Sequence, residues 1–260
     1  MPLIDPLYSL AGVLVGLLVG LTGVGGGSLM TPILVLVFGF HPATAVGTDL
    51  LYASATKTAG TLVHGKRGSV DWAVVGRLAA GSLPAALLML ALLASSNHDA
   101  RNTNGLISLI LGGALVLTAF AVFFRARMIA RLAPAFAGVS EKRIGWLTVA
   151  LGAVLGALVT LTSVGAGALG MTALLILYPK RPVATLVGSD IAHAVPLTLI
   201  AGIGHLSMGS VNIGLLLSLL AGSIPGIVVG SLIATRVSER VLTPILATTL
   251  GIVGVKLLWG

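Results

Sequence analysis

The chain consists largely of long apolar runs that few charged residues interrupt. The runs at 43–63, 70–94 and 106–124 each approach or exceed the roughly 20 residues that a helix needs to cross a bilayer. Only 8% of the 260 residues are charged and 57% are hydrophobic, whereas a soluble domain has about a quarter of its residues charged. The strands of a transmembrane barrel would alternate apolar and polar residues. The sequence therefore predicts an all-α fold, a polytopic bundle of transmembrane helices.

The net charge of +8 is distributed as in a membrane protein. One connection between apolar runs holds Arg125, Arg127, Arg131, Lys142 and Arg143, and basic residues of this kind mark the cytoplasmic side. No nucleic-acid-binding motif accompanies the charge, so no nucleic-acid partner is expected. The chain has no cysteine, which excludes disulfides and thiolate metal sites. We expect a multi-pass protein of the cell membrane (plasma or inner membrane), with the lipid bilayer as a partner.

Two parts of the sequence repeat each other. Residues 21–27 (LTGVGGG) match residues 161–167 (LTSVGAG) at an offset of 140, and after one inserted residue Asp49 meets Asp190. Five blocks that recur in the same order indicate a duplication. The expected organisation is a first transmembrane repeat at 1–124, a basic cytoplasmic connection at 125–143 and a second transmembrane repeat at 144–260.

Each repeat contains one glycine-interrupted run, followed by three full spans. The interrupted runs are 7–40 and 144–178, and the spans are expected at 43–63, 70–94 and 104–124 and again at 183–206, 210–234 and 241–259. Basic residues at the span ends predict that 43–63 runs inward and 183–206 runs outward. We therefore expect two inverted-topology repeats, an architecture typical of secondary transporters, whose substrate site lies at the repeat interface.

The glycine-rich breaks within the interrupted runs leave two structures and two roles open. Split there, each arm has about 16 residues and is about 24 Å long, less than the roughly 30 Å hydrocarbon core, which fits a re-entrant pair or a tilted pair. Broken helices expose N–H groups that lipid cannot satisfy, and such groups at a helix N-terminus suit a small oxyanion. The structural alternative is a tight turn with close helix packing through Gly12, Gly16 and Gly20.

The predicted substrate-binding residues are the glycines and hydroxyls of the two breaks, together with one lysine. They are Thr22, Gly23, Gly25, Gly26, Gly27, Ser28, Thr31, Lys57, Thr162, Ser163, Gly165 and Gly167. Lys57 is the only basic residue well inside a span, where it supplies positive potential for an anion; its alternative is to snorkel toward the interface. The matched position in the second repeat holds Thr198.

A second set of ionisable residues is predicted to serve coupling or gating. The set is Asp49, Asp190, His64, His193 and His205. Ionisable groups at membrane depth are costly and usually functional. Two roles are open for the aspartates: proton coupling, or a structural role in helix capping or pairing with Lys57. Asp49 and Lys57 are expected about 12 Å apart on one helix face, without contact. For His64 and His205, anchoring at the interface competes with proton relay. Asp190 and His193 share a face but lack a third metal ligand, so no metal is expected.

The motif GVGGGSLMTPIL in the first run and the segment VGTDLLYASATKTAGTLVHGKRGSVDW (46–72) resemble the TauE/SafE, or sulfite exporter, family of membrane permeases. A weaker copy, TSVGAGALGMTALLILYPKRPVATLVGSD, occupies 162–190, and the resemblance covers nearly the whole chain. It implies a permease for small anions such as sulfite, organosulfonates or other small organic anions. In the second copy Ser163, Ala166 and Ala168 replace two glycines and a serine, so the two halves are not expected to contribute equally.

Two other classes of function compete with transport. An intramembrane enzyme is disfavoured because neither G-x-S-x-G nor H-E-x-x-H occurs. A non-transporting accessory or scaffold subunit would not need Asp49, Lys57 and Asp190 inside the membrane. We expect no cofactor and a small anionic substrate as partner; the direction of transport, its energy coupling and the oligomeric state, a homo-oligomer included, stay open.

Overall fold

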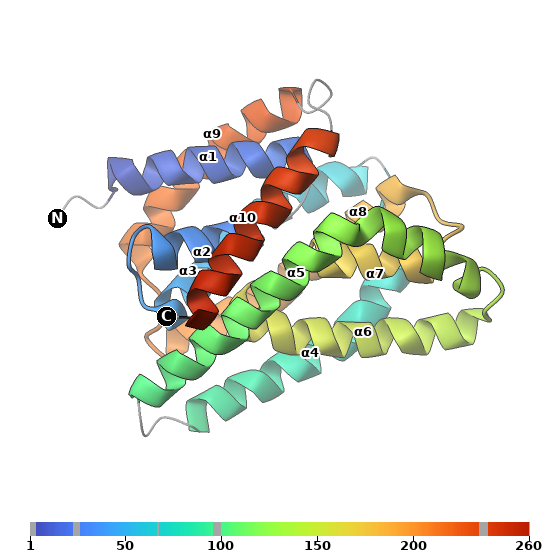
Figure 1. The fold of residues 1–260 in the computed structure, drawn as a ribbon, viewed down its shortest axis with the longest axis horizontal. Helices are drawn as coiled ribbons and strands as arrows, with labels where there is room; N and C mark the ends of the chain where they lie inside the picture. The colour runs from blue at the N-terminus through green and yellow to red at the C-terminus, as the bar shows by residue number, and fades with distance from the viewer. Residues whose placement is uncertain (1–3, 23–26, 67, 96–99, 234–238, 260) are drawn as a thin grey trace.

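A computed structural model of the chain describes residues 4–22, 27–66, 68–95, 100–233 and 239–259. Within these ranges it contains ten helices and no strand (Figure 1). The first half holds α1 (Pro6–Thr22), α2 (Gly27–Leu36), α3 (Pro42–Lys66), α4 (Trp72–Ser95) and α5 (Ala100–Phe136). The second half holds α6 (Glu141–Thr162), α7 (Leu169–Leu177), α8 (Val183–Ser207), α9 (Ile213–Ile233) and α10 (Glu239–Trp259).

The helices and their surface are those of a multi-pass membrane protein. In the described ranges, four segments are long and apolar enough to cross a membrane: Trp72–Ser95, Ile107–Phe136, Glu141–Thr162 and Val183–Ser207. Large apolar side chains such as Leu88, Phe120 and Val154 are exposed on the outside of the bundle. Extensive apolar surface marks a lipid or protein interface. The prediction of an all-α transmembrane bundle is therefore confirmed.

The second interrupted run contains the predicted break, because α6 ends at Thr162 and α7 begins at Leu169. The break predicted in the first run, between α1 and α2, lies at residues 23–26, outside the described residues. The expectation of equal arms of about 16 residues was wrong, because α6 has 22 residues and α7 has 9. At 1.5 Å per residue these helices are about 33 Å and about 14 Å long. α6 is thus long enough to cross the hydrocarbon core, and α7, which stops just before Pro179, is not.

Most of the basic connection at 125–143 is helical. α5 continues through the arginines to Phe136, and only residues 137–140 separate it from α6. Arginine, alanine and leucine are strong helix formers, which explains why the helix outlasts the apolar span. The guanidinium carbon of Arg127 lies 5.7 Å from the centre of the Phe124 ring. The basic residues therefore project from a helix end.

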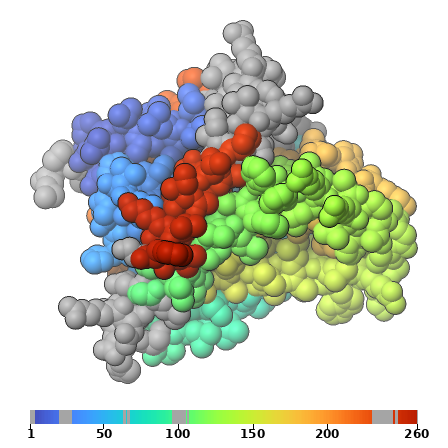
Figure 2. Space-filling model, viewed as in Figure 1, coloured from blue at the N-terminus to red at the C-terminus, as the bar shows by residue number. Residues whose placement is uncertain are grey.

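Helices from the two halves pack against each other in corresponding pairs. α1 lies along α9, α4 along α6 and α10 beside α5 (Figure 1). Figure 2 shows α10 in red, lying between α1 and α2 on one side and the green α5 on the other. Close approach depends on glycine: a Cβ atom at Gly16 would lie 2.8 Å from Cα of Ser223, and one at Gly156 would lie 2.7 Å from Cα of Ser82. The small-residue stripe of α1 thus packs directly on the backbone of α9.

Candidate functional site

α3 places Asp49 beside the arm that follows the first break. Asp49 is completely buried, and its Oδ2 accepts hydrogen bonds from the Thr31 hydroxyl at 2.5 Å and from the Thr31 backbone N–H at 3.2 Å. Its Oδ1 has no hydrogen-bond partner among the described residues. The contact brings two predicted site residues together and holds α2 against α3.

Lys57, two turns further along α3, reaches the second break. Its side chain is buried, and Nζ donates a hydrogen bond to the backbone carbonyl of Ala166 at 2.8 Å. The ammonium interacts electrostatically with Asp190 and Asp49. Neither carboxylate forms a direct ion pair with it in the described part of the chain. Lys57 therefore does not snorkel; it links the first half of the chain to the break in the second.

The second break, residues 163–168, is buried along its whole length. Ser163, Gly165 and Gly167 have φ values of 58°, 117° and 146°, which favour glycine and strain a serine. Ser163 ends α6 by donating its backbone N–H to the Val159 carbonyl at 2.7 Å. Its own hydroxyl, in a residue only 4% exposed, lies next to the Asp49 carboxyl group, without a hydrogen bond of good geometry among the described residues.

Backbone donors accompany this hydroxyl at the start of α7. Within the described residues, no acceptor is assigned to the N–H groups of residues 166–169. Unpaired N–H groups at a helix N-terminus attract anions. Thr162, also predicted to bind substrate, is instead used by the backbone: its hydroxyl donates to the Leu158 carbonyl at 2.7 Å and accepts from the Val164 N–H at 3.1 Å. The donor set is therefore the Ser163 hydroxyl with the adjoining N–H groups.

α8 brings Asp190 and His193 to the same region. Asp190 is 3% exposed, and its Oδ1 lies against Gly170 in the first turn of α7. A Cβ atom added at Gly170 would be only 2.6 Å from this oxygen. Nε2 of the buried His193 forms a 2.8 Å hydrogen bond with the Ser82 hydroxyl of α4. Asp190 Oδ1 and His193 Nδ1 have no partner in the described part of the chain. Both side chains are electrostatic neighbours of Lys57.

His205 is separate from this cluster. Its side chain is 2% exposed, and Nε2 forms a 2.9 Å hydrogen bond with the backbone carbonyl of Thr160. The histidine thus fastens the last turn of α8 to α6 inside the protein, and its role in anchoring, gating or proton relay stays a prediction. The matched His64 lies in α3, but its side chain is outside the described residues.

The first break itself falls outside what the structure describes. This applies to Gly23, Gly25 and Gly26, and to the side-chain surroundings of Thr22, Gly27 and Ser28. For these six residues substrate binding stays a prediction.

Sequence reasoning missed the side chains that meet the buried polar groups across the two halves. Ser82 of α4 contacts His193 of α8. Correspondingly, the hydroxyl of Tyr52 in α3 lies next to Ser223 of α9, without a hydrogen bond of good geometry. Tyr52 matches His193 at the offset of 141 residues, and Ser82 matches Ser223. The repeated block that contains both serines was the available signal.

Replacing Thr31 with valine should lower the melting temperature of the detergent-solubilised protein. The change removes the hydroxyl donor from a buried carboxyl group, and a hydrogen bond to a charged or buried polar group contributes about 1–3 kcal/mol. Thr31→Ser keeps the donor and is the matched control. Equal melting temperatures for the valine and serine variants would show that the Thr31–Asp49 contact contributes nothing to stability.

Comparisons with known proteins identify a family model and several similar membrane transporter proteins. The model of the family described as "Sulfite exporter TauE/SafE" matches residues 8–257. The chain is 40% identical over 252 residues to the probable membrane transporter protein YjnA of Bacillus subtilis (strain 168), an alignment that covers 96% of this chain and 98% of the relative. It is 27% identical over 252 residues to the probable membrane transporter protein YdhB of the same organism, covering 95% and 97%. No solved structure matches the chain.

Proposed function

The chain belongs to the sulfite exporter TauE/SafE family, and we propose that this multi-pass membrane transporter is a permease for small anions in the cell membrane. The proposed substrates are sulfite, organosulfonates and similar small organic anions. One observation carries the proposal: the buried ammonium of Lys57 contacts the second break at Ala166. There the nearby N–H groups have no assigned acceptor among the described residues, and the Ser163 hydroxyl lies next to the Asp49 carboxyl group without a hydrogen bond of good geometry.

These groups form the kind of site that a small oxyanion needs. An ammonium, a hydroxyl and several backbone N–H groups are all donors, and charge-assisted hydrogen bonds to an oxyanion are stronger than neutral ones. Inside a membrane, irregular backbone of this kind belongs where it lines a cavity or meets other protein groups. We assign Lys57 and Ser163 to the anion, together with the backbone of Gly165 and Gly167.

The charge balance of the site favours proton coupling. Asp49 and Asp190 both lie close enough to Lys57 to interact with it electrostatically. Two ionised carboxylates and one ammonium leave a net negative charge, which repels an incoming anion. A proton bound by one carboxyl group removes that repulsion, and buried carboxyl groups serve as proton carriers in transporters. We therefore assign Asp49 and Asp190 to the coupling of anion and proton movement.

Matched contacts across the two halves support the proposed inverted repeats. The Asp71 N–H donates to the Ser189 hydroxyl at 2.8 Å, and the Asn212 N–H donates to the Thr48 hydroxyl at 3.1 Å. Both members of the second pair lie 141 residues from their counterparts in the first. Such reciprocal contacts are typical of repeats related by a two-fold axis. Lys57 and Ala166 then meet at the repeat interface, where transporters of this architecture bind substrate.

Purified protein in liposomes should take up sulfite, and uptake should accelerate when the pH gradient drives protons in the same direction. Asp190→Asn should weaken that acceleration and leave the melting temperature nearly unchanged. A gradient without effect on the wild-type rate would remove proton coupling but not anion transport. No flux of sulfite, sulfoacetate or acetate would instead favour the accessory-subunit alternative.

A further inference from the structure

A second polar cluster lies beyond the far end of α7, outside the site just proposed. A cavity of about 380 Å³ opens between the start of α4, the end of α5, the start of α6 and the α7–α8 connection. Its charged and polar lining includes Asp71, Arg77, Glu141, Tyr178, Lys180 and Arg181. Three of these side chains are basic and two are acidic. A water molecule occupies about 30 Å³ of liquid, so the cavity has room for a small hydrated anion.

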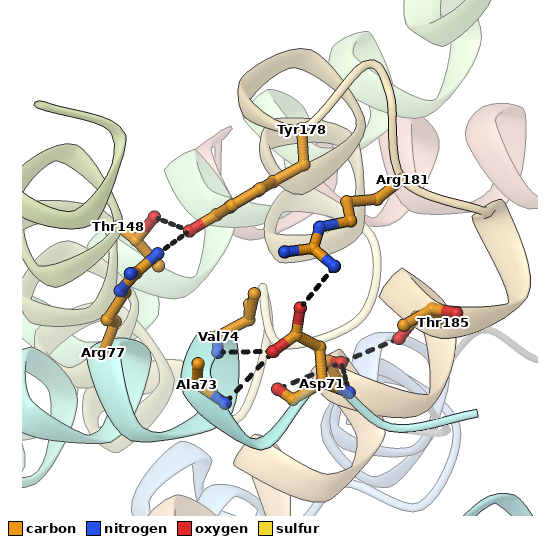
Figure 3. A network of polar contacts seen from close by, with 9 residues as sticks. Asp71, Ala73, Val74, Arg77, Thr148, Tyr178, Arg181 and Thr185 are labelled. Carbon is orange, nitrogen blue, oxygen red and sulfur yellow. Dashed lines mark hydrogen bonds and ion pairs between the residues drawn. The ribbon is translucent and has the colours of Figure 1, made fainter. Parts of the chain in front are cut away.

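Tyr178 ties one wall of the cavity to the other (Figure 3). Arg77 Nη1 donates a hydrogen bond to the Tyr178 hydroxyl at 3.3 Å, and the same hydroxyl is 2.7 Å from the Thr148 hydroxyl of α6. Tyr178 directly follows α7, so this contact fixes the end of the short helix whose start carries the second break. The guanidinium of Arg77 has five N–H donors, and this contact uses one of them.

Asp71 pairs with Arg181, but its carboxylate is held mainly by hydrogen bonds from the start of α4. Asp71 Oδ1 accepts hydrogen bonds from the first N–H groups of α4, at Ala73 and Val74, with lengths of 3.1 and 3.3 Å. Asp71 Oδ2 lies 3.4 Å from Arg181 Nη1, and the Arg181 side chain is 51% exposed. Exposed ion pairs contribute about 0–1 kcal/mol. Arg181 can therefore exchange this carboxylate for another anion at small cost.

The corresponding positions in the other half of the chain hold no arginine. At the matched offsets of 140 and 141 residues, the positions of Thr148, Tyr178, Arg181, Asp71 and Arg77 correspond to Tyr8, Phe38, His41, Asn212 and Ser218. There the Tyr8 and Phe38 rings pack edge to face with centroids 5.0 Å apart. The repeat therefore does not require arginines at positions 77 and 181.

We propose that the cavity is a vestibule that binds a small oxyanion through Arg77 and Arg181 before the anion passes along α7 to the second break. The inference rests on the proposed function, because it adds an entry site to the same pathway. A planar guanidinium matches two oxygens of a sulfite, sulfonate or carboxylate group. The surrounding basic residues assign this end to the cytoplasmic side.

Binding can be tested separately from transport with sulfite as the probe. In the detergent-solubilised full chain, Lys57→Met weakens the central site, so the remaining rise in melting temperature with sulfite reports the vestibule. We expect this rise to persist in Lys57→Met and to disappear when Arg77→Gln and Arg181→Gln are added. Arg131→Gln, an exposed arginine of α5 outside the cavity lining, is the matched control and should keep it.

Flux from each side gives the second measurement. Arg181→Gln should raise KM about threefold for sulfite offered at the cytoplasmic face, which corresponds to about 0.7 kcal/mol, and leave the maximal rate and the KM at the other face unchanged. Arg181→Lys should recover part of the loss. Undiminished sulfite binding in the triple variant, or equal KM values for Arg181→Gln and Arg131→Gln, would refute the vestibule. Wild-type flux that depends on Lys57 would still uphold the proposed function in that case.

Discussion

Replacement of Lys57 with methionine is expected to lower the initial rate of sulfite uptake into liposomes about 10- to 100-fold. The variant loses the ammonium that contacts Ala166 and that faces Asp49 and Asp190. A hydrogen bond with a charged group contributes about 1.5–3 kcal/mol, and about 2.7 kcal/mol corresponds to a factor of 100. Methionine keeps most of the apolar volume, so packing around α3 should persist. Uptake is measured at equal amounts of reconstituted protein.

Two further variants make this result interpretable. Lys57→Arg keeps the charge and should retain part of the activity, whereas Arg131→Gln removes an exposed charge from α5 and should behave as wild type. If Lys57→Met does not fold, the double variant Lys57→Met/Asp190→Asn also removes one of the two carboxylates that the lysine faces. Uptake within about twofold of wild type, in folded Lys57→Met or in the folded double variant, would contradict the assignment of Lys57 to the anion.

A methyl group at Gly156 is expected to lower the melting temperature by several degrees. The added carbon would lie 2.7 Å from Cα of Ser82, so α4 and α6 would have to separate. Overpacking of this kind costs about 1–3 kcal/mol, and rotation of a side chain cannot relieve it because the obstructing atoms belong to the backbone. The measurement is thermal unfolding of Gly156→Ala in detergent.

The chain contains both a matched partner and neutral controls for this substitution. Gly16→Ala places the same group 2.8 Å from Cα of Ser223 and should destabilise to a similar degree. Gly76 and Gly113 have no heavy atom within 4 Å of an added Cβ, so alanine there should leave stability unchanged or raise it through helix propensity. A Gly156→Ala protein as stable as Gly76→Ala would show that α4 and α6 are not closely packed.

The length of the apolar runs and the prolines and glycines that flank them predicted the helices well. The spans expected at 43–63 and 183–206 became Pro42–Lys66 and Val183–Ser207, because prolines stand at or before each start and polar glycine-containing turns follow. The position of the second break was also predictable, since Gly165 and Gly167 have φ values that other residues rarely adopt. Features that depend on local conformational preference, such as helix bounds and breaks, could therefore be predicted from the sequence.

Contacts between the halves were not readable in the same way. Lys57 and Ala166 are 109 residues apart, and no periodicity reports which carbonyl a buried ammonium will meet. The sequence could not assign Arg77 and Arg181 to one cavity, because their grouping with Tyr178 depends on how α4, α6 and α7 dock. The repeat alignment matches Tyr52 with His193 and Ser82 with Ser223. Once the contact between His193 and Ser82 is known, it predicts that Tyr52 lies next to Ser223.

The hydrogen bond from Lys57 goes to a main-chain oxygen, and this has a consequence for how the second break can vary. Every residue type at position 166 has a backbone carbonyl. The alanine found there therefore accepts this hydrogen bond as well as the glycine of the first copy would. The constraint falls instead on the path of the backbone through Gly165 and Gly167. The side chains of this segment can vary while its backbone conformation is retained. A repeat copy with a divergent sequence can therefore keep the same contact with Lys57.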